Sequence, residues 1–152
     1  MSVVAIVLAA GLGSRFGSDK RLARLSTSHT LLSQSVERAL AVFDEVRVVL
    51  RDGERADDFA LPAGCRIIHS PQALLGMGHS LAAGALSLHD SDACVVAVLL
   101  GDMPWISVQT LEQLKQQATA TSIAFPRYQG ERGHPVFFGR AFWPELTRLN
   151  GD

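Results

Sequence analysis

The chain has 152 residues, 47% of them hydrophobic and 19% charged, which suits one domain with a buried core and excludes a disordered chain. Its 14 basic and 15 acidic residues leave a formal net charge of −1. This balance excludes a general electrostatic attraction to nucleic acid or to an anionic membrane, so any anion-binding site must be local.

The cysteines and the lengths of the apolar runs indicate a cytoplasmic protein. Cys65 and Cys94 are too few for a disulfide scaffold or a cysteine-based zinc site. No Lys or Arg precedes the first apolar run, which argues against a secretory signal. The two longest runs, residues 3–10 and 93–100, are far shorter than the roughly 20 residues of a membrane-spanning helix.

The first apolar run leads into a glycine-rich loop. Its β-branched content predicts a strand over residues 3–9 that is buried on both faces. The loop that follows has the pattern Gly-x-Gly-x-Arg-x-Gly-x-x-Lys, from Gly11 to Lys20. Its glycines allow main-chain N–H groups to approach phosphate oxygens, while Arg15 and Lys20 add positive charge. The segment therefore predicts a phosphate-binding site.

Two common phosphate loops do not fit this spacing. A Walker loop requires a second glycine after four intervening residues, but Phe16 and Ser18 occupy those positions. The Rossmann fingerprint requires its third glycine where Phe16 stands. The alternative is an ordinary glycine-rich turn between a strand and a helix, and the two cations within the loop argue against it.

Short apolar runs then alternate with segments of helical period. Strands are predicted at residues 3–9, 46–50, 66–68, 93–100, 122–125 and 135–138. Helices are predicted between them, at residues 32–43, at residues 79–88, and after an N-cap at Ser107. This alternation predicts a single α/β domain over residues 1–152, with a mainly parallel sheet between two helical layers. Ligands of such sheets bind beyond the carboxyl ends of the strands.

Three further polar segments follow predicted strands or precede one. Asp102 comes directly after the apolar run 93–100 and is a candidate Mg²⁺ ligand, because magnesium takes one or two carboxylates together with phosphate oxygens. The alternative makes Asp102 a turn former before the Ser107 helix. Residues 76–80, Gly-Met-Gly-His-Ser, would present backbone N–H groups to a nucleobase or a phosphate, or would form a simple entry turn capped by Ser80. Residues 130–136 would offer Arg132 and His134 to an anionic acceptor, or would only connect a hairpin.

In this order the segments resemble those of the molybdenum-cofactor nucleotidyltransferases. That family is a branch of the NTP-transferase superfamily and has a Rossmann-like three-layer α/β/α fold of the nucleotide-diphospho-sugar transferase type. The resemblance covers nearly the whole sequence and is carried by residues 8–20, 76–80, 100–104 and 132–136. The first and third segments are specific for the superfamily, and the fourth is more particular to the cofactor-directed branch.

The resemblance implies a role for each segment. The nucleotide triphosphate would be held by Leu8, Ala9, Ala10, Gly11, Gly13, Ser14, Arg15 and Lys20. The nucleotide base would lie near Gly76, Gly78 and Ser80. The acceptor would be approached by Arg132, Gly133, His134 and Pro135. Mg²⁺ would be bound by Asp102, which with Arg15 and Lys20 would form the catalytic set.

The end of the chain differs from the family pattern. Relatives continue past a Gly-Asp element that carries a second acid beside the metal, whereas this sequence stops at Asn150-Gly151-Asp152. We therefore expect Asp152 to be that second metal ligand, at a C-terminus that is truncated.

The function that the resemblance implies is transfer of CMP from CTP to the terminal phosphate of molybdopterin, with release of pyrophosphate. The Ala-Ala-Gly sequence at residues 9–11 is similar to that of cytidylyltransferases and favours CTP over GTP. The alternatives are a GTP-dependent guanylyltransferase of the same cofactor, a sugar-phosphate nucleotidyltransferase, and a nucleotide-binding module without catalysis. A molybdoenzyme or a cofactor-delivery protein is the expected macromolecular partner.

Overall fold

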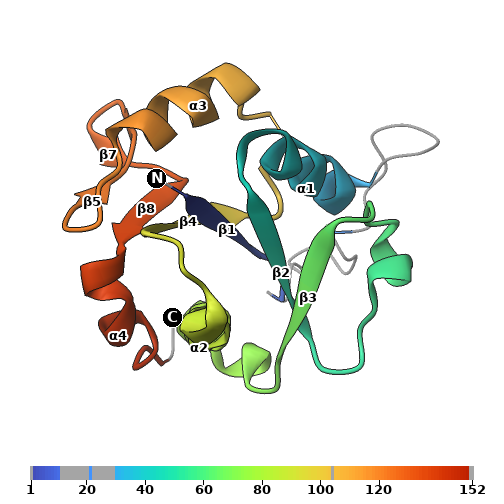
Figure 1. Ribbon diagram of the computed structural model, residues 1–152. Helices are drawn as coiled ribbons and strands as arrows, with labels where there is room; N and C mark the ends of the chain where they lie inside the picture. The colour runs from blue at the N-terminus through green and yellow to red at the C-terminus, as the bar shows by residue number, and fades with distance from the viewer. Residues whose placement is uncertain (1, 11–20, 22–29, 104, 151–152) are drawn as a thin grey trace.

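A computed structural model describes residues 2–10, 21, 30–103 and 105–150 of the chain. Figure 1 shows a twisted sheet with helices packed on both of its faces. The six strands of the sheet lie in the order β3-β2-β1-β4-β8-β5. Their bounds are β1 (Val3–Leu8), β2 (Glu45–Arg51), β3 (Cys65–Ser70), β4 (Val95–Leu100), β5 (Ile123–Ala124) and β8 (Val136–Gly139).

The sheet is mainly parallel, as predicted. β1 pairs in parallel with β2 and with β4, and β2 pairs in parallel with β3. The two strands at the other edge, β8 and β5, are antiparallel to their neighbours. A separate two-stranded ribbon of β6 (Arg127–Tyr128) and β7 (Glu131–Arg132) precedes β8. β8 therefore runs back from the edge of the sheet at which β4 ends, a direction that apolar periodicity alone does not predict.

The helices form the two outer layers. α1 (Leu31–Val42) and α3 (Val108–Gln117) cover one face, while α2 (Met77–Leu86) and α4 (Trp143–Leu146) cover the other (Figure 1). Short 3₁₀ turns connect these elements at η2 (Ala56–Phe59), η3 (Ala73–Leu75), η4 (Ser87–Asp90) and η5 (Arg140–Phe142). The α/β/α arrangement confirms the predicted fold class. Among the described residues no helix has the length and apolarity needed to cross a bilayer.

Local sequence explains where two of the helices begin. The Ser107 side chain accepts a hydrogen bond from the Thr110 amide at the start of α3, so the predicted N-cap is confirmed. At the start of α1, Thr30 and Ser33 satisfy each other's backbone N–H groups in a reciprocal cap. α2 begins at Met77 with Gly76 as its N-cap, two residues before the predicted start, so Ser80 is not the cap.

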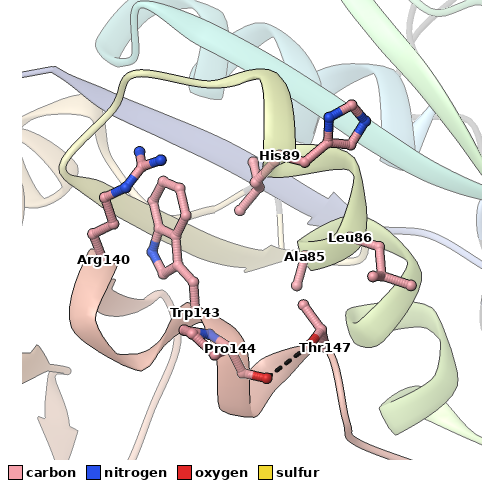
Figure 2. A pocket seen from close by; sticks show the side chains of 8 residues that line it. Ala85, Leu86, His89, Arg140, Trp143, Pro144 and Thr147 are labelled. Atoms are coloured by element: carbon pink, nitrogen blue, oxygen red, sulfur yellow. Dashed lines mark hydrogen bonds between the residues drawn. The ribbon is translucent and has the colours of Figure 1, made fainter.

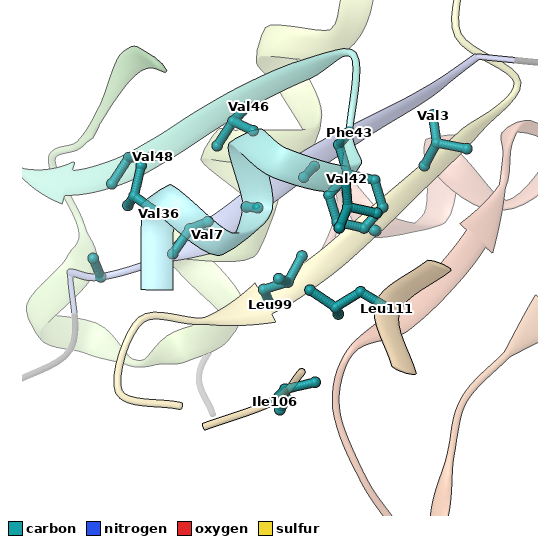
Figure 3. Packing of buried hydrophobic residues seen from close by; sticks show 14 of the residues in the cluster. Val3, Val7, Val36, Val42, Phe43, Val46, Val48, Leu99, Ile106 and Leu111 are labelled. Atoms are coloured by element: carbon teal, nitrogen blue, oxygen red, sulfur yellow. The ribbon is translucent and has the colours of Figure 1, made fainter. Parts of the chain in front are cut away.

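The core consists of two apolar layers, one on each side of the sheet. All six residues of β1 are buried, as predicted for a strand covered on both faces. Val3 and Val7 face the α1 and α3 layer, where Figure 3 shows them packed with Val36, Leu99 and Leu111. The alternate residues of β1 belong to the layer beneath α2 and α4. Val108, the first residue of α3, has an exposed side chain and does not contribute to this core.

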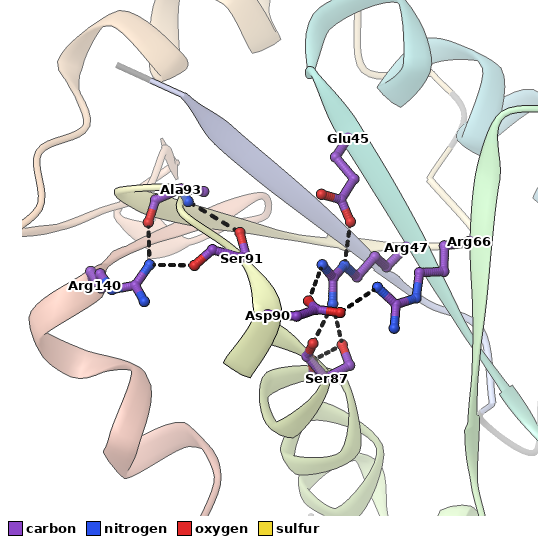
Figure 4. Close-up of polar contacts among 9 residues, drawn as sticks. Glu45, Arg47, Arg66, Ser87, Asp90, Ser91, Ala93 and Arg140 are labelled. Atoms are coloured by element: carbon purple, nitrogen blue, oxygen red, sulfur yellow. Dashed lines mark hydrogen bonds and ion pairs between the residues drawn. The ribbon is translucent and has the colours of Figure 1, made fainter.

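A charged cluster stabilises the amino-terminal edge of the sheet. Arg47, on β2, is only 2% exposed and contacts Glu45, Ser87 and Asp90 (Figure 4). Arg66 of β3 donates a second hydrogen bond to Asp90, at 2.8 Å. The hydrogen bonds from Arg66 and Arg47 hold the pKa of Asp90 well below its ordinary value. The cluster therefore joins β2 and β3 to the turn η4.

The lowered pKa of Asp90 predicts an acid-sensitive contribution to stability. The contribution is present above the unfolded-state pKa of about 3.9 and is lost as the pH falls below it toward the folded value. We expect the urea midpoint of the wild type to fall more between pH 6 and pH 3 than that of Asp90→Asn, measured by circular dichroism. Asp92→Asn, which removes a neighbouring exposed carboxylate, is the control and should follow the wild type. Equal acid sensitivity of Asp90→Asn and the wild type would contradict the assignment.

Candidate functional site

The carboxyl ends of β1 and β4 lie side by side at one edge of the sheet. Leu8 is level with Leu100 in the parallel ladder, and the Gly101 amide donates to the Leu8 carbonyl at 3.0 Å. On the other side of β1, the Ala9 amide donates to the Val49 carbonyl at 3.0 Å. The end of β1 and the Asp102 turn are thus neighbours at the carboxyl edge of the sheet, where ligands of parallel sheets bind.

Gly101 sets the approach of the Asp102 turn to the first strand. A Cβ at Gly101 would lie 2.8 Å from the Leu32 Cδ1 atom and 3.1 Å from the Leu8 carbonyl oxygen, so the position has no room for a side chain. The Ser35 hydroxyl donates to the Gly101 carbonyl at 2.9 Å. The turn is therefore packed against α1, while the Asp102 side chain itself is exposed at the edge of the sheet.

His134 lies in the connection between β7 and β8, near enough to Asp102 for the charge of that carboxylate to act on it. The ladder between β8 and β4 begins with Val136 opposite Val98, near the carboxyl end of β4, and His134 lies two residues before Val136. Burial lowers the pKa of His134 below its ordinary value, although the negative charge of Asp102 acts in the opposite direction. The residues predicted for metal binding and for acceptor binding are therefore close enough to interact electrostatically.

The rest of the predicted acceptor segment is held by local contacts. The Arg132 guanidinium lies 4.6 Å from the centre of the Phe125 ring and is exposed. The Gly133 amide donates to the Pro126 carbonyl at 2.8 Å, and a side chain at Gly133 would collide with the Tyr128 ring. Pro135 is buried. The segment therefore contains the second strand of a hairpin and its connection to β8, and the acceptor-binding roles of Arg132 and His134 stay predictions.

The Gly-Met-Gly-His-Ser segment forms the first turn of α2. Gly76 adopts a φ of 134°, which favours glycine, and Gly78 follows it inside the helix. Ser80 is buried, so its side chain faces the sheet. Ala73, in the turn before the helix, packs in the same apolar cluster as Leu8 and Ala10. The amino-terminal end of α2 therefore lies at the same edge as the end of β1.

The remaining predicted residues divide into two groups. The side chains of Leu8, Ala9 and Ala10 are packed in the core, so only their main chain is available for nucleotide contacts. The other predicted residues lie outside the described part of the chain: Gly11, Gly13, Ser14, Arg15, Lys20 and Asp152. Their roles stay predictions.

Sequence reasoning missed a set of residues that surrounds Ala9 and Ala10. Arg21 donates to the Ala9 carbonyl at 2.8 Å, and Arg51 donates to the Ala10 carbonyl at 3.1 Å. Glu54 accepts two hydrogen bonds from Arg21. The only signal in the sequence was an arginine directly after Lys20, and nothing in the pattern connects it to a glutamate 33 positions later.

The described residues at this edge fit a divalent metal that is bound jointly by the protein and by phosphate. Among the described residues no group of three or more His, Cys, Asp or Glu side chains is placed to bind a metal. Asp102 supplies one exposed carboxylate. Mg²⁺ commonly binds through one or two carboxylates and completes its shell with substrate phosphates and water, so this donor set fits a metal that arrives with a nucleotide.

An open pocket lies at the opposite edge of the sheet and does not belong to this site. It has a volume of about 260 Å³ and lies between the end of α2 and α4 (Figure 2). Arg140, on its wall, donates to the Ser91 and Ala93 carbonyls, just before β4 begins. Its indole neighbour Trp143 is buried beneath that guanidinium. The pocket is thus separated from Asp102 by the length of β4.

Known proteins of related sequence span different lengths. The purine catabolism protein PucB of Bacillus subtilis is 29% identical over 99% of this chain and 77% of its own length. A probable molybdenum cofactor guanylyltransferase of Methanosarcina mazei is 25% identical over 95% of this chain and 66% of its own length. The bifunctional protein GlmU of Ruegeria is 27% identical over 92% of this chain, which spans only 31% of that relative.

Solved structures of similar fold cover the whole chain. Rv0371c of Mycobacterium tuberculosis has a TM-score of 0.84 and 28% identity, over 100% of this chain and 78% of that one. A structure of Rv0371c in complex with manganese has a TM-score of 0.80. A nucleotidyl transferase of Methanothermobacter has a TM-score of 0.81 and 25% identity, over 99% of this chain and 77% of that one.

The family assignment follows from the part of the chain that the family model covers. The model of the MobA-like NTP transferase domain matches residues 5–152, which include most of the buried first strand, the Asp102 turn and the His134 segment. The guanylyltransferase relative and the Methanothermobacter structure also align over nearly the whole chain. The chain therefore belongs to the MobA-like NTP transferase domain family and is a nucleotidyltransferase of that type.

Proposed function

We propose that the protein transfers CMP from CTP to the terminal phosphate of molybdopterin and releases pyrophosphate. One observation carries the proposal: the end of β1, the Asp102 turn and His134 meet at one edge of the sheet. A nucleotide bound at this edge would have its triphosphate beside the glycine-rich loop. Its α-phosphate would then lie between that loop and the segment that presents Arg132 and His134.

The proposed charged residues of the nucleotide site are Arg15, Lys20 and Asp102. Arg15 and Lys20 would bind the triphosphate and neutralise the departing pyrophosphate. Asp102 would hold Mg²⁺, which supplies charge neutralisation on the phosphate oxygens when it is bound. The manganese complex of Rv0371c supports divalent-metal use in a protein of this fold.

The acceptor needs little activation by the protein. A phosphate monoester is mostly dianionic at pH 7, because its second pKa is about 6, so no strong general base is required. The lowered pKa of His134 keeps its imidazole uncharged at that pH, and a neutral imidazole offers one N–H donor. Arg132 provides the positive charge at the same segment. Catalysis would then come from positioning and charge rather than from proton transfer.

The nucleotide base is proposed to lie against the segment that leads into α2. The amino-terminal turn of α2 presents backbone N–H groups at the positive end of the helix. Ser70, at the end of β3, has a buried hydroxyl without a hydrogen-bond partner among the described residues. Residues 9–11, Ala-Ala-Gly, favour cytosine, whereas the guanylyltransferase relative favours GTP as the second candidate.

A matrix of nucleotides and acceptors tests the proposal. Pyrophosphate release would be measured with Mg²⁺ and each of CTP, GTP, ATP and UTP, in the presence of molybdopterin or of a sugar phosphate. We expect release with CTP and molybdopterin. Release with GTP would change the nucleotide, and release with a sugar phosphate would change the acceptor to that second class. Tight binding of Mg²⁺ and CTP by calorimetry, without pyrophosphate in any combination, would instead favour a binding module.

Replacing the lysine of the glycine-rich loop should separate turnover from folding. We expect Lys20→Ala to lower kcat by roughly 100-fold, because one group that stabilises developing charge is removed. Thermal unfolding should change little. Lys115→Ala is the matched control, because Lys115 lies on α3 and donates to the Val42 carbonyl at the far end of α1, so its loss should leave kcat unchanged. Full kcat in Lys20→Ala would remove Lys20 from the mechanism.

A further inference from the structure

A cluster of charged side chains around one buried aromatic ring holds the main chain at the point where β1 leaves the sheet. Its members are Arg21, Arg51, Glu54, Phe59 and His69. Phe59 is 3% exposed. Arg21 is only 6% exposed, which is unusual for an arginine. None of these residues belongs to the motifs from which the activity was proposed.

The Arg21 guanidinium is fixed on both its edge and its face. Its Nη1 and Nη2 atoms donate to the two carboxylate oxygens of Glu54 at 2.7 and 2.6 Å. Nη1 also donates to the Ala9 carbonyl at 2.8 Å, and the guanidinium carbon lies 4.5 Å from the centre of the Phe59 ring. A bidentate carboxylate pair and an aromatic face together restrict a planar cation to one orientation. Glu54 supplies the counter-charge.

Two arginines extend the pairing of β1 beyond the end of the sheet. The Ala9 amide still bonds to β2, through the Val49 carbonyl. The next carbonyls, of Ala9 and Ala10, accept from Arg21 and Arg51 in place of a neighbouring strand. Because the peptide group is planar and trans, fixing the Ala9 carbonyl also fixes the direction of the Ala10 N–H. The main chain therefore enters the glycine-rich segment in a defined direction.

The end of β2 and the loop after it, residues 51–59, contact the chain at Ala10, Arg21 and Thr30. Besides holding Ala10 and Arg21, this segment accepts a hydrogen bond from the Thr30 hydroxyl at the Phe59 carbonyl, at 2.8 Å. Glu54 is itself anchored, because its carboxylate accepts from the Arg51 amide at 2.8 Å and its carbonyl bonds to the His69 ring at 2.8 Å. Residues 51–59 thus connect β1, α1 and β3.

We propose that Glu54 is a positioning residue for nucleotide binding, which acts by holding Arg21 against the Ala9 carbonyl. The inference rests on the proposed function, since it assigns the glycine-rich segment to the triphosphate. Glu54 makes no contact with substrate in this scheme. Its effect reaches the nucleotide through Arg21 and the main chain of Ala9 and Ala10, so nucleotide affinity should depend on it more than acceptor affinity does.

The test compares Glu54→Gln with a matched change in the same loop. Glu54→Gln keeps the shape of the side chain and loses its charge, so it weakens the bidentate pair with Arg21. We expect the Kd of the CTP–Mg²⁺ complex to rise at least tenfold, a size typical of changes that misorient a binding group. The KM of the acceptor should change less than twofold. Asp57→Asn is the control, because Asp57 is 89% exposed and pairs only with the exposed Arg55 among the described residues; it should bind nucleotide as the wild type does.

Three further measurements separate positioning from simple stabilisation. Hydrogen exchange of the peptide that contains residues 3–10 should accelerate in Glu54→Gln at temperatures where both proteins are folded. The double variant Arg21→Gln with Glu54→Gln should bind nucleotide no more weakly than the worse single variant, because the two side chains act as one unit. Arg21→Lys keeps the charge without the bidentate fork and provides a second test if Glu54→Gln does not fold.

The outcomes distinguish the two proposals. Wild-type nucleotide affinity in both Glu54→Gln and Arg21→Lys would overturn the positioning role and leave the proposed function intact. Equal losses of nucleotide and acceptor affinity, in step with a lower melting temperature, would also overturn it. A wild-type protein that binds neither CTP nor GTP with Mg²⁺ would overturn both.

Discussion

Asp102→Asn should abolish most nucleotidyl transfer while leaving the protein folded. The substitution removes an exposed carboxylate in the turn after β4, next to the residue that bonds to the end of β1, and its charge acts on His134. An amide keeps the size of the side chain but loses the charge that would hold a divalent metal on the triphosphate. We expect kcat to fall by roughly 100-fold or more, the scale measured when one charge-stabilising group is removed from an active site. Pyrophosphate release with Mg²⁺ over a range of concentrations measures the effect.

Asp102 is exposed, so its effect on turnover can be separated from an effect on stability. An exposed side chain contributes little to the core, so the free energy of unfolding should change by no more than about 0.5 kcal/mol. Asp44→Asn provides the control, because Asp44 is an exposed carboxylate between α1 and β2, away from the carboxyl edge. Normal turnover by Asp102→Asn at ordinary Mg²⁺ concentrations would exclude Asp102 as the metal ligand.

Gly139→Ala should strongly destabilise the fold. Gly139 ends β8 with φ −61° and ψ 154°, a conformation open to any residue, so the cost is steric rather than conformational. A Cβ at this position would overlap the backbone carbonyl groups of Ala120 and Thr119. Backbone atoms cannot move aside as a flexible side chain does, so we expect a loss of about 3 kcal/mol in the free energy of unfolding. Urea unfolding followed by circular dichroism measures it.

A second glycine separates steric cost from backbone strain. Gly130, in the connection between β6 and β7, has a φ of 83°, and a Cβ added there would meet no described heavy atom within 4 Å. Gly130→Ala should therefore cost only the strain of a left-handed conformation, about 1 kcal/mol. If Gly139→Ala were no more destabilising than Gly130→Ala, the close approach of β8 to residues 119–120 would be wrong.

Much of the fold was predictable because the informative contacts are local. β1 and β4 are buried on both faces, so each is a continuous apolar run that the sequence displays directly. Ser107 caps α3 through a residue three positions later, and such a signal needs no knowledge of the rest of the chain. The start of α2 was misplaced by two residues, because a glycine N-cap provides no side-chain signal.

The candidate site was predictable only in part. Asp102 and His134 were each identified from the strand beside them, but their proximity depends on β8 running antiparallel to β4. The hydrogen bonds that Arg21 and Arg51 donate to the Ala9 and Ala10 carbonyls were not predicted at all. Arg21 and Glu54 lie 33 residues apart and come together only because residues 51–59 fold back over the end of β1.

By itself the sequence determined the buried strands, the capped helix and the chemical character of the loops, since these follow from neighbouring residues and their periodicity. Tertiary structure alone decided the direction of β8, the meeting of Asp102 with His134 and the burial of Arg21 against Glu54. These features depend on pairings between distant segments. Bringing distant segments together costs chain entropy, and their polar contacts are stabilised only after the sheet has formed and the core has lost its water. No local pattern of residues therefore encodes them.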